Sequence, residues 1–559
     1  MAQASNSGAT FLERKKASIY AKIDVWQTRA ARLLVLLMLC VQPLYLNKHR
    51  YVDLTQHKFV FFLICMGIVL LAVLIIWIAR LTRSPRLLPE DKLSVADWAI
   101  LGFAAVTVVS ALFSPYRGAV LGPPYEGTYN IWTGYPERHD GVITQLLYVA
   151  IYFIVSRWYR PNKNDFALFG LSASLVALIG ILQFYGMDFL SLWPNDNPKY
   201  YAENFYNIFF RSTLGNINIV STYVCVAVLL CGFLFVKMKS RWRPLWLIGS
   251  ALNFWMMELA DSDSGRVGLL VAMVLMIPFM IESRKTLGKT LILGASWVSA
   301  YALQLLFYEV RAREARTTES LQPYAAAAFV LAVAGAALLI FGKEKGPDAQ
   351  AEPDEKEQLT QRKRWGQWAQ RKQWKQLALG LALIVLCIIA GFAGIEIIGS
   401  RDAEAGKTSS IIYELREIMH GNIEDHFASA RIYIWRNAME AFPKNPIIGA
   451  GPDAFYYAFP EEAHGYQNTF FENAHNEYLQ YLICQGILGL LCYLVFIGGT
   501  LVKAVPQAMK NPFVLATLAA FTGYCIQAFF NLSLPITSQL LWVCAGVLAS
   551  KRVREVVVL

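Results

Sequence analysis

A histidine begins a long apolar segment near the C-terminus, in the order His475-Asn476, nine residues, Gly486, two residues, Gly489. Residues 478–499 are almost wholly apolar, which predicts a membrane helix. On such a helix Gly486 would lie roughly 20° from His475, and Gly489 roughly 40° to the other side. Glycines let a neighbouring helix approach closely, so this stripe is expected to face protein and to direct His475 into the bundle. Histidine exchanges a proton near neutral pH, and an ionisable residue in such a place is a functional candidate.

The composition of the whole chain is that of a polytopic membrane protein. Of its 559 residues, 56% are hydrophobic and only 16% are charged, against about 25% in soluble chains. The sequence predicts an all-α integral membrane protein with about fourteen transmembrane helices. The expected spans are 33–46, 59–79, 95–113, 141–156, 166–185, 213–236, 244–260, 265–281, 290–308, 323–342, 376–398, 475–502, 513–531 and 535–550.

Basic residues predict the orientation of these spans. About two-thirds of the 51 Lys and Arg residues lie in alternate connections, on one side. By the positive-inside rule that side is cytoplasmic, so both termini are expected in the cytoplasm and His475 outside. The net charge of +11 is then mainly a topology signal. The alternative, a basic nucleic-acid-binding protein, has no supporting motif, and no nucleic-acid partner is expected.

The predicted organisation is one membrane domain with a large, helical outer loop. Its expected parts are a cytoplasmic segment 1–32, membrane helices 1–10 within 33–342, a cytoplasmic connector 343–375, membrane helix 11 at 376–398, an extracytoplasmic loop 399–474, membrane helices 12–14 within 475–550, and a cytoplasmic tail 551–559.

The outer loop is expected to contain helices near 409–420 and 427–442. Arg431 and Trp435 are four residues apart and share a face of the second helix. A shorter outer loop, 114–140, is rich in Gly, Pro and aromatic residues. Such aromatic residues form either an interfacial belt or a platform for sugars, and the belt is the commoner outcome.

Four stretches, taken in order on a polytopic chain, resemble the O-antigen ligase-like superfamily, and the similarity covers roughly 140–500. They are Arg211-Ser212-Thr213-Leu214-Gly215-Asn216-Ile217-Asn218, in which Ile217 departs from a proline of the family; Ser264-Gly265-Arg266, an imperfect match to a Ser-Arg-Gly-like turn; Arg431-Ile432-Tyr433-Ile434-Trp435 with Pro446 and Gly449-Ala450-Gly451; and His475-Asn476 with Gly486 and Gly489.

The resemblance implies a GT-C-like glycosyltransferase that works without metal or other cofactor. In this family a glycan moves from a polyprenyl (undecaprenyl) diphosphate donor to a hydroxyl of another glycan, a lipid or a protein. The reaction takes place on the outer face of the bacterial cytoplasmic (inner) membrane and inverts the anomeric configuration. The family contains lipopolysaccharide O-antigen ligases, surface-polysaccharide polymerases and protein O-oligosaccharyltransferases, so the resemblance leaves the acceptor open.

The resemblance also implies roles for residues of this chain. His475 would be the base that takes the acceptor proton, kept neutral by the positive end of the helix that it begins. Arginines would bind the leaving diphosphate, because their guanidinium groups match its oxygens. The candidates are Arg211 and Arg431, followed by Arg266 and Arg138, with Asn476, Gly486, Gly489 and Trp435 in support.

Each of these residues has a plainer alternative. Arg431 could pair with Glu424 or Asp425, Arg211 could extend to lipid headgroups, and Arg266 could cap a turn. Asp261 and Asp263 could hold a divalent cation, but paired acids also cap tight turns. A rival from another class is a lipid-linked oligosaccharide flippase or transporter. That rival would need charges deep in the bundle, whereas the candidate charges lie at its outer ends.

Overall fold

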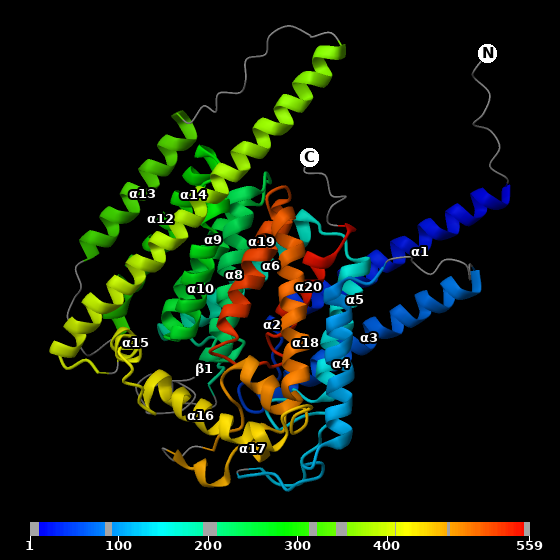
Figure 1. The fold of residues 1–559 in the computed structure, drawn as a ribbon, viewed down its shortest axis with the longest axis vertical. Coiled ribbons are helices and arrows are strands. Elements are labelled where there is room, and N and C mark those ends of the chain that lie inside the picture. Colours follow the sequence, from blue (N-terminus) through cyan, green and yellow to red (C-terminus); the bar gives the residue numbers. More distant parts are fainter. Residues whose placement is uncertain are drawn as a thin grey trace.

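The computed structural model is an all-helical bundle with one small two-stranded sheet (Figure 1). It describes residues 11–83, 92–123, 125–193, 210–311, 321–341, 355–408, 410–466 and 470–552. In the sheet, β1 (Phe210–Arg211) pairs antiparallel with β2 (Gly215–Asn216). The predicted all-α class is therefore confirmed.

Within the described residues, eight helices are long and apolar enough to cross a membrane. They are α3 (Leu54–Arg83), α4 (Val95–Phe113), α6 (Lys163–Phe184), α8 (Ile217–Lys237), α12 (Arg284–Arg311), α13 (Leu321–Phe341), α14 (Glu355–Glu404) and α18 (Glu477–Ala508). Three shorter apolar helices accompany them, α5 (Val142–Trp158), α19 (Pro512–Gln527) and α20 (Gln539–Ala549). These helices mark the chain as a membrane protein, while the number fourteen stays a prediction.

Some predicted spans take a different form in the structure. The first ends in a π-helical turn (Leu37–Val41) and α2 (Gln42–Leu44), which follow α1 (Phe11–Leu36). The segment expected at 265–281 is divided into α10 (Asp263–Leu275) and α11 (Ile277–Met280). Pro278 lies in the first turn of α11, where its missing N–H is tolerated, whereas it would break a continuous helix. α9 (Arg243–Ala260) occupies the segment expected at 244–260.

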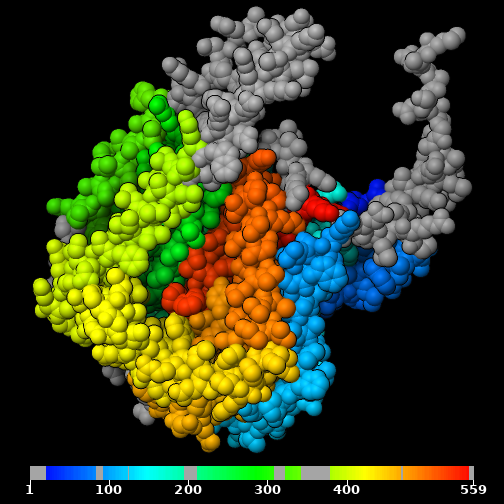
Figure 2. All heavy atoms as spheres, viewed as in Figure 1, coloured from blue at the N-terminus to red at the C-terminus, as the bar shows by residue number. Residues whose placement is uncertain are grey.

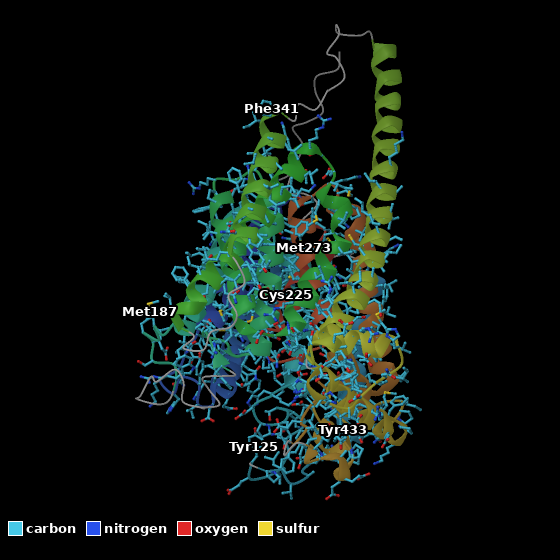
Figure 3. The ribbon with its side chains drawn as sticks, turned by 90° about the vertical axis from the view of Figure 1, so that its left-hand side faces the viewer. Tyr125, Met187, Cys225, Met273, Phe341 and Tyr433 are labelled. Atoms are coloured by element: carbon cyan, nitrogen blue, oxygen red, sulfur yellow. The ribbon has the colours of Figure 1, made fainter. Side chains whose placement is uncertain are left out.

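The core is built around α8, which is apolar on all sides. Its most apolar window is wholly buried, as expected for a helix that is hydrophobic all round. α9 and α19 pack directly on it, and Cys225 of α8 lies deep inside the bundle in Figure 3. By contrast, the corresponding windows of α13 and α14 are 11% and 0% buried. Those apolar surfaces are suited to contact lipid.

Two long connections gather at one end of the bundle. One joins α4 to α5, and the other carries α15 (Ile411–Met419), α16 (Phe427–Ala441) and α17 (Phe455–Ala458) (Figure 1). The helices expected near 409–420 and 427–442 are therefore present as α15 and α16. Tyr125 and Tyr433 lie at this end, and Phe341 of α13 lies at the opposite end (Figure 3). The end that carries Tyr125 and Tyr433 is called the loop end below.

Candidate functional site

His475 precedes α18 and does not belong to it. The helix begins at Glu477, and the side chain of Asn476 caps it by accepting hydrogen bonds from the N–H groups of Tyr478 (3.0 Å) and Leu479 (3.1 Å). His475 itself has a left-handed φ of 46°. The expectation that the helix starts at His475 is thus wrong by two residues. Asn476 prefers the cap because its short side chain reaches the free amides of the first turn.

Hydrogen bonds hold the backbone of His475 from several sides. Its own N–H donates to Oδ1 of Asn473 (2.9 Å). The preceding residue, Ala474, accepts from Nε1 of Trp435 (2.9 Å) and donates to Oε1 of Gln480 (3.0 Å). The backbone around a strained residue is therefore fixed by α16 on one side and α18 on the other. Trp435 thus bonds directly to the backbone that precedes the histidine, and its supporting role stays a prediction.

The two glycines that follow His475 have different neighbours. A side chain on Gly486 would meet the backbone of Ile447 at 2.3 Å, and one on Gly449 would meet that of Cys484 at 2.3 Å. The helix opens at Gly486, where φ is +68°, and the loop before α17 inserts there. Ala450 and Gly451 donate to the carbonyls of Ile483 and Cys484 (both 2.9 Å), and Ile487 and Leu488 donate to those of Pro446 and Ile447 (2.8 and 3.2 Å).

This opening corrects the prediction of one continuous glycine stripe. Gly486 receives a loop and not a helix, so helical angles cannot be carried from His475 through it. Only Gly489 behaves partly as expected: a side chain there would lie at an ordinary contact distance of 3.6 Å from Val106 of α4, although it would first meet Gln485 of its own helix at 2.3 Å. The physical reason is that glycine tolerates the left-handed backbone needed to interrupt a helix as easily as it tolerates close packing. The sequence pattern alone does not separate the two uses.

Arg138 lies buried in the connection between α4 and α5. Its Nε donates to Oδ1 of Asp453 at 2.7 Å, and the two side chains are 4% and 0% exposed. Asp453 also accepts from the N–H groups of Tyr135 (2.7 Å) and Asp140 (3.3 Å). Nη1 and Nη2 of Arg138 are buried and have no hydrogen-bond partner among the described residues. Asp453 thus holds the guanidinium group through Nε, and the two terminal nitrogens remain as donors without a partner among the described residues.

Arg431 lies at the start of the regular part of α16. Ala428, Ser429 and Ala430 before it all have left-handed φ angles of 53–63°, which costs of order 1–2 kcal/mol per residue for side chains other than glycine. Nη1 of Arg431 donates to the carbonyl of Ala428 (2.8 Å), and its buried Nε has no partner among the described residues. The predicted alternative partners are engaged elsewhere, Asp425 with Arg436 and Glu424 with His426.

The charges of both arginines act on the histidine. Burial, and then the positive charges of Arg431 and Arg138, lower the pKa of His475 to about 3. The imidazole is therefore neutral at physiological pH, and its buried Nδ1 has no partner among the described residues. The neutral state was expected from the dipole of α18, but burial and two guanidinium groups are the main causes here.

The other two predicted arginines have different surroundings. Arg211, in β1, donates to the carbonyl of Phe210 (2.9 Å), and its guanidinium lies 5.7 and 5.9 Å from the rings of Phe184 and Trp193. Arg266 forms ion pairs through all three nitrogens, with Glu258 (3.2 Å), Asp261 (3.1 Å) and Asp263 (3.2 Å). Of the four candidate arginines, Arg138 and Arg431 are the two whose charges lower the pKa of His475.

The acidic pair is occupied by the same contacts. Asp261 and Asp263 each bind Arg266, so their charges are already matched by a side chain. Across the described segments, no group of three or more His, Cys, Asp and Glu side chains is arranged to hold a metal ion.

Sequence reasoning missed two acids of this site. Asp453 follows the turn Gly449-Ala450-Gly451-Pro452, and nothing in its neighbourhood in the sequence points to Arg138. Glu472 lies three residues before His475. Burial raises the pKa of Glu472 to about 7; the charge of Arg138 opposes this shift, and Glu137 and Asp453 add to it. In the sequence, the one available sign of these acids was that Glu472 lies so close to the His475-Asn476 pair.

Comparison with known proteins supports the resemblance directly. Residues 325–494 match a family model described as O-Antigen ligase. No curated protein matches the chain. The matched segment contains Arg431, Trp435, His475, Gly486 and Gly489, whereas Arg138 and Arg211 lie before it. The match confirms the resemblance of this membrane protein to the O-antigen ligase-like superfamily, over residues 325–494.

Proposed function

We propose that the protein is a glycosyltransferase that moves a glycan from a polyprenyl (undecaprenyl) diphosphate to an acceptor hydroxyl, on the outer face of the cytoplasmic membrane. The observation that supports this most is a buried, neutral histidine inside the segment that matches the O-antigen ligase model, with the charges of Arg431 and Arg138 acting on it. A base and an anion site side by side are what transfer from a diphosphate requires. The acceptor belongs to a glycan, a lipid or a protein, as in an O-antigen ligase or a surface-polysaccharide polymerase.

In this mechanism His475 takes the proton of the acceptor hydroxyl while the oxygen attacks the anomeric carbon. The bond from that carbon to the diphosphate oxygen breaks, and the leaving diphosphate gains negative charge. Arg138 offers two unpartnered nitrogens for it, in the fork that suits phosphate, and Arg431 adds a second positive charge. One displacement inverts the anomeric configuration. These arginines supply the charge compensation without a metal ion.

The bound donor would also tune the base. In the free protein, burial and then the charges of the two arginines lower the pKa of His475 to about 3, so the imidazole binds a proton weakly. A diphosphate between the arginines brings negative charge that offsets theirs, and this raises the pKa of His475 toward a useful range. The histidine would then become a competent base only when a donor is present.

The polyprenyl chain needs an apolar path to the membrane. Figure 2 shows a hollow between α14 and α18 on the face in view, leading toward the loop end. The apolar window of α14 is 0% buried, and Phe529, at an edge of the site, packs against Trp435 while 45% exposed. We place the lipid tail in this hollow, with its diphosphate toward His475.

The test is transfer by the purified full-length protein, using an undecaprenyl-diphosphate-linked glycan and a candidate acceptor, with the product detected by mass spectrometry. His475→Ala should lower the rate by about 10²–10⁴ and retain donor binding. His420→Ala is the matched control, because this half-exposed histidine of the outer loop pairs with Glu396 and lies outside the site. A fully active His475→Ala protein, or lipid movement in vesicles with no transfer, would reject the proposal in favour of a flippase.

A further inference from the structure

Four tyrosines gather beside Arg138 at the loop end, from segments far apart in the sequence. Tyr125 and Tyr135 come from the α4–α5 connection, and Tyr456 and Tyr457 from α17. Tyr135 contacts the other three. The centroid of its ring lies 5.6 Å from that of Tyr125, 5.4 Å from that of Tyr456 and 6.2 Å from that of Tyr457. Tyr135 is fully buried and the other three are partly exposed. We call these four residues the tyrosine platform; Tyr135 is its floor.

Glu472 connects the platform to the site of His475. Burial, followed by the charge of Glu472, raises the pKa of Tyr125, Tyr135 and Tyr456. The same carboxyl group interacts with Arg138. The charge of one acid therefore acts both on the platform and on the arginine that we assign to the diphosphate. Asp453 joins these two directly, since it accepts from the N–H of Tyr135 (2.7 Å) and from Nε of Arg138 (2.7 Å).

The platform contains a polar group that the protein leaves unsatisfied. The hydroxyl of Tyr457 is buried and has no hydrogen-bond partner among the described residues. A buried polar group without a partner costs about 1–3 kcal/mol, so such groups usually have a ligand or water to satisfy them. A second tyrosine pair at the loop end differs. Tyr433 and Tyr466 stack on each other at 4.0 Å, and the Tyr433 hydroxyl donates to the carbonyl of Ala463 (3.1 Å).

These features suit one class of ligand. A pyranose presents apolar C–H faces, which pack on aromatic rings, and a rim of hydroxyls, which bond to carboxylates and phenols. Tyrosine offers a large, rigid and amphipathic surface at low cost in conformational entropy. A carboxylate accepts from several hydroxyls at once. We propose that the tyrosine platform, with Glu472, binds a saccharide next to the reacting centre.

This inference rests on the proposed function for the identity of the saccharide. It is a sugar unit of the donor glycan, whose diphosphate lies at Arg138, or of an acceptor glycan, whose hydroxyl lies at His475. The chemistry of recognition is the same for both. A membrane-facing role for the rings is less suited to the structure, because the platform lies in the α4–α5 connection and on the short α17, and its floor is fully buried.

The first experiment measures binding without turnover. The probe is the soluble oligosaccharide released by mild acid from the surface glycan of the cell that makes the protein, added to the full-length protein in detergent. The Kd of the wild type is the reference. Tyr456→Ala and Tyr457→Ala should weaken binding about tenfold, whereas Tyr456→Phe, which keeps the ring, should weaken it much less. Tyr466→Ala is the matched control and should bind as wild type does.

The second experiment identifies the source of the sugar. In the transfer assay, a tyrosine variant should raise the KM of either the donor or the acceptor and change kcat little. Binding of the oligosaccharide without any transfer would leave the platform in place and reject the proposed function. Transfer and binding unaffected by Tyr456→Ala and Tyr457→Ala would reject the platform alone. Variants that lose only the stabilisation given by added anionic phospholipid would assign the rings to lipid headgroups and overturn the inference.

Discussion

Arg138 and Arg266 both lie beside carboxylates at the loop end, yet they are used differently. Arg266 directs Nε, Nη1 and Nη2 to three separate acids. Arg138 directs only Nε to one acid, Asp453, and its two terminal nitrogens stay without a partner. An arginine whose donors are all bound to carboxylates has little left for an anionic ligand. We therefore expect the number of partners, and not the presence of an arginine, to decide which guanidinium binds a diphosphate.

The largest effect is expected for Arg138→Ala, which tests the contrast between Arg138 and Arg266. Loss of a preorganised donor pair should lower the transfer rate by about 10²–10³. The variant should also lose about 3–5 kcal/mol of stability, because Asp453 is left as an uncompensated buried charge. Arg138→Lys should recover only part of the rate, since an ammonium group cannot reproduce the fork. Rates per folded molecule, with thermal unfolding measured alongside, check this. A wild-type rate in Arg138→Ala would remove Arg138 from the site.

Arg431→Ala should cost about 10² in rate and change the pH profile. Removing a positive charge near His475 raises the pKa of the imidazole. The base must be neutral to act, so the acid side of the kcat/KM profile should move to higher pH. Arg266→Ala should leave this profile in place. The measurement is the rate of transfer from pH 4 to pH 9 for both variants. An unmoved profile in Arg431→Ala would contradict the effect of the Arg431 charge on His475.

Asp453→Asn sharpens the comparison by separating charge from position. Arg138 keeps its charge but loses the ion pair that orients it, so we expect about a tenfold fall in rate. The loss of stability should resemble that of Arg138→Ala, because the same buried pair is broken. Asp453→Asn is thus the control that shows how much of the Arg138→Ala defect comes from unfolding. Equal rates for the two variants would mean that stability explains both.

The smallest effect is expected for Arg266→Ala. Its ion pairs involve partly exposed groups, and such pairs are worth about 0–1 kcal/mol each. Transfer should therefore fall by less than about fivefold. Chelators should not change this result if the arginines supply the positive charge. A loss of rate as large as that of Arg138→Ala would restore Arg266 to the diphosphate site and remove the contrast between the two arginines.

Part of the candidate site was predicted from the sequence. His475, Arg138 and Arg431 were all among the predicted residues, and α15 and α16 appear where they were expected. The glycine stripe, however, assumed a continuous helix. Gly486 opens that helix to admit the loop of Gly449. A glycine marks a place without a side chain, but the pattern does not say whether a helix or a loop fills that space.

The sequence by itself determined the helical membrane class, because long apolar runs must form helices in lipid. It also contained the partners of Arg266, since Glu258, Asp261 and Asp263 lie within eight residues and Asp263 is three residues away on the same helix. The partner of Arg138 is 315 residues away along the chain. Only the tertiary structure decided that pairing, because local helix geometry acts over a few residues, whereas the meeting of two distant loops depends on how the whole bundle packs.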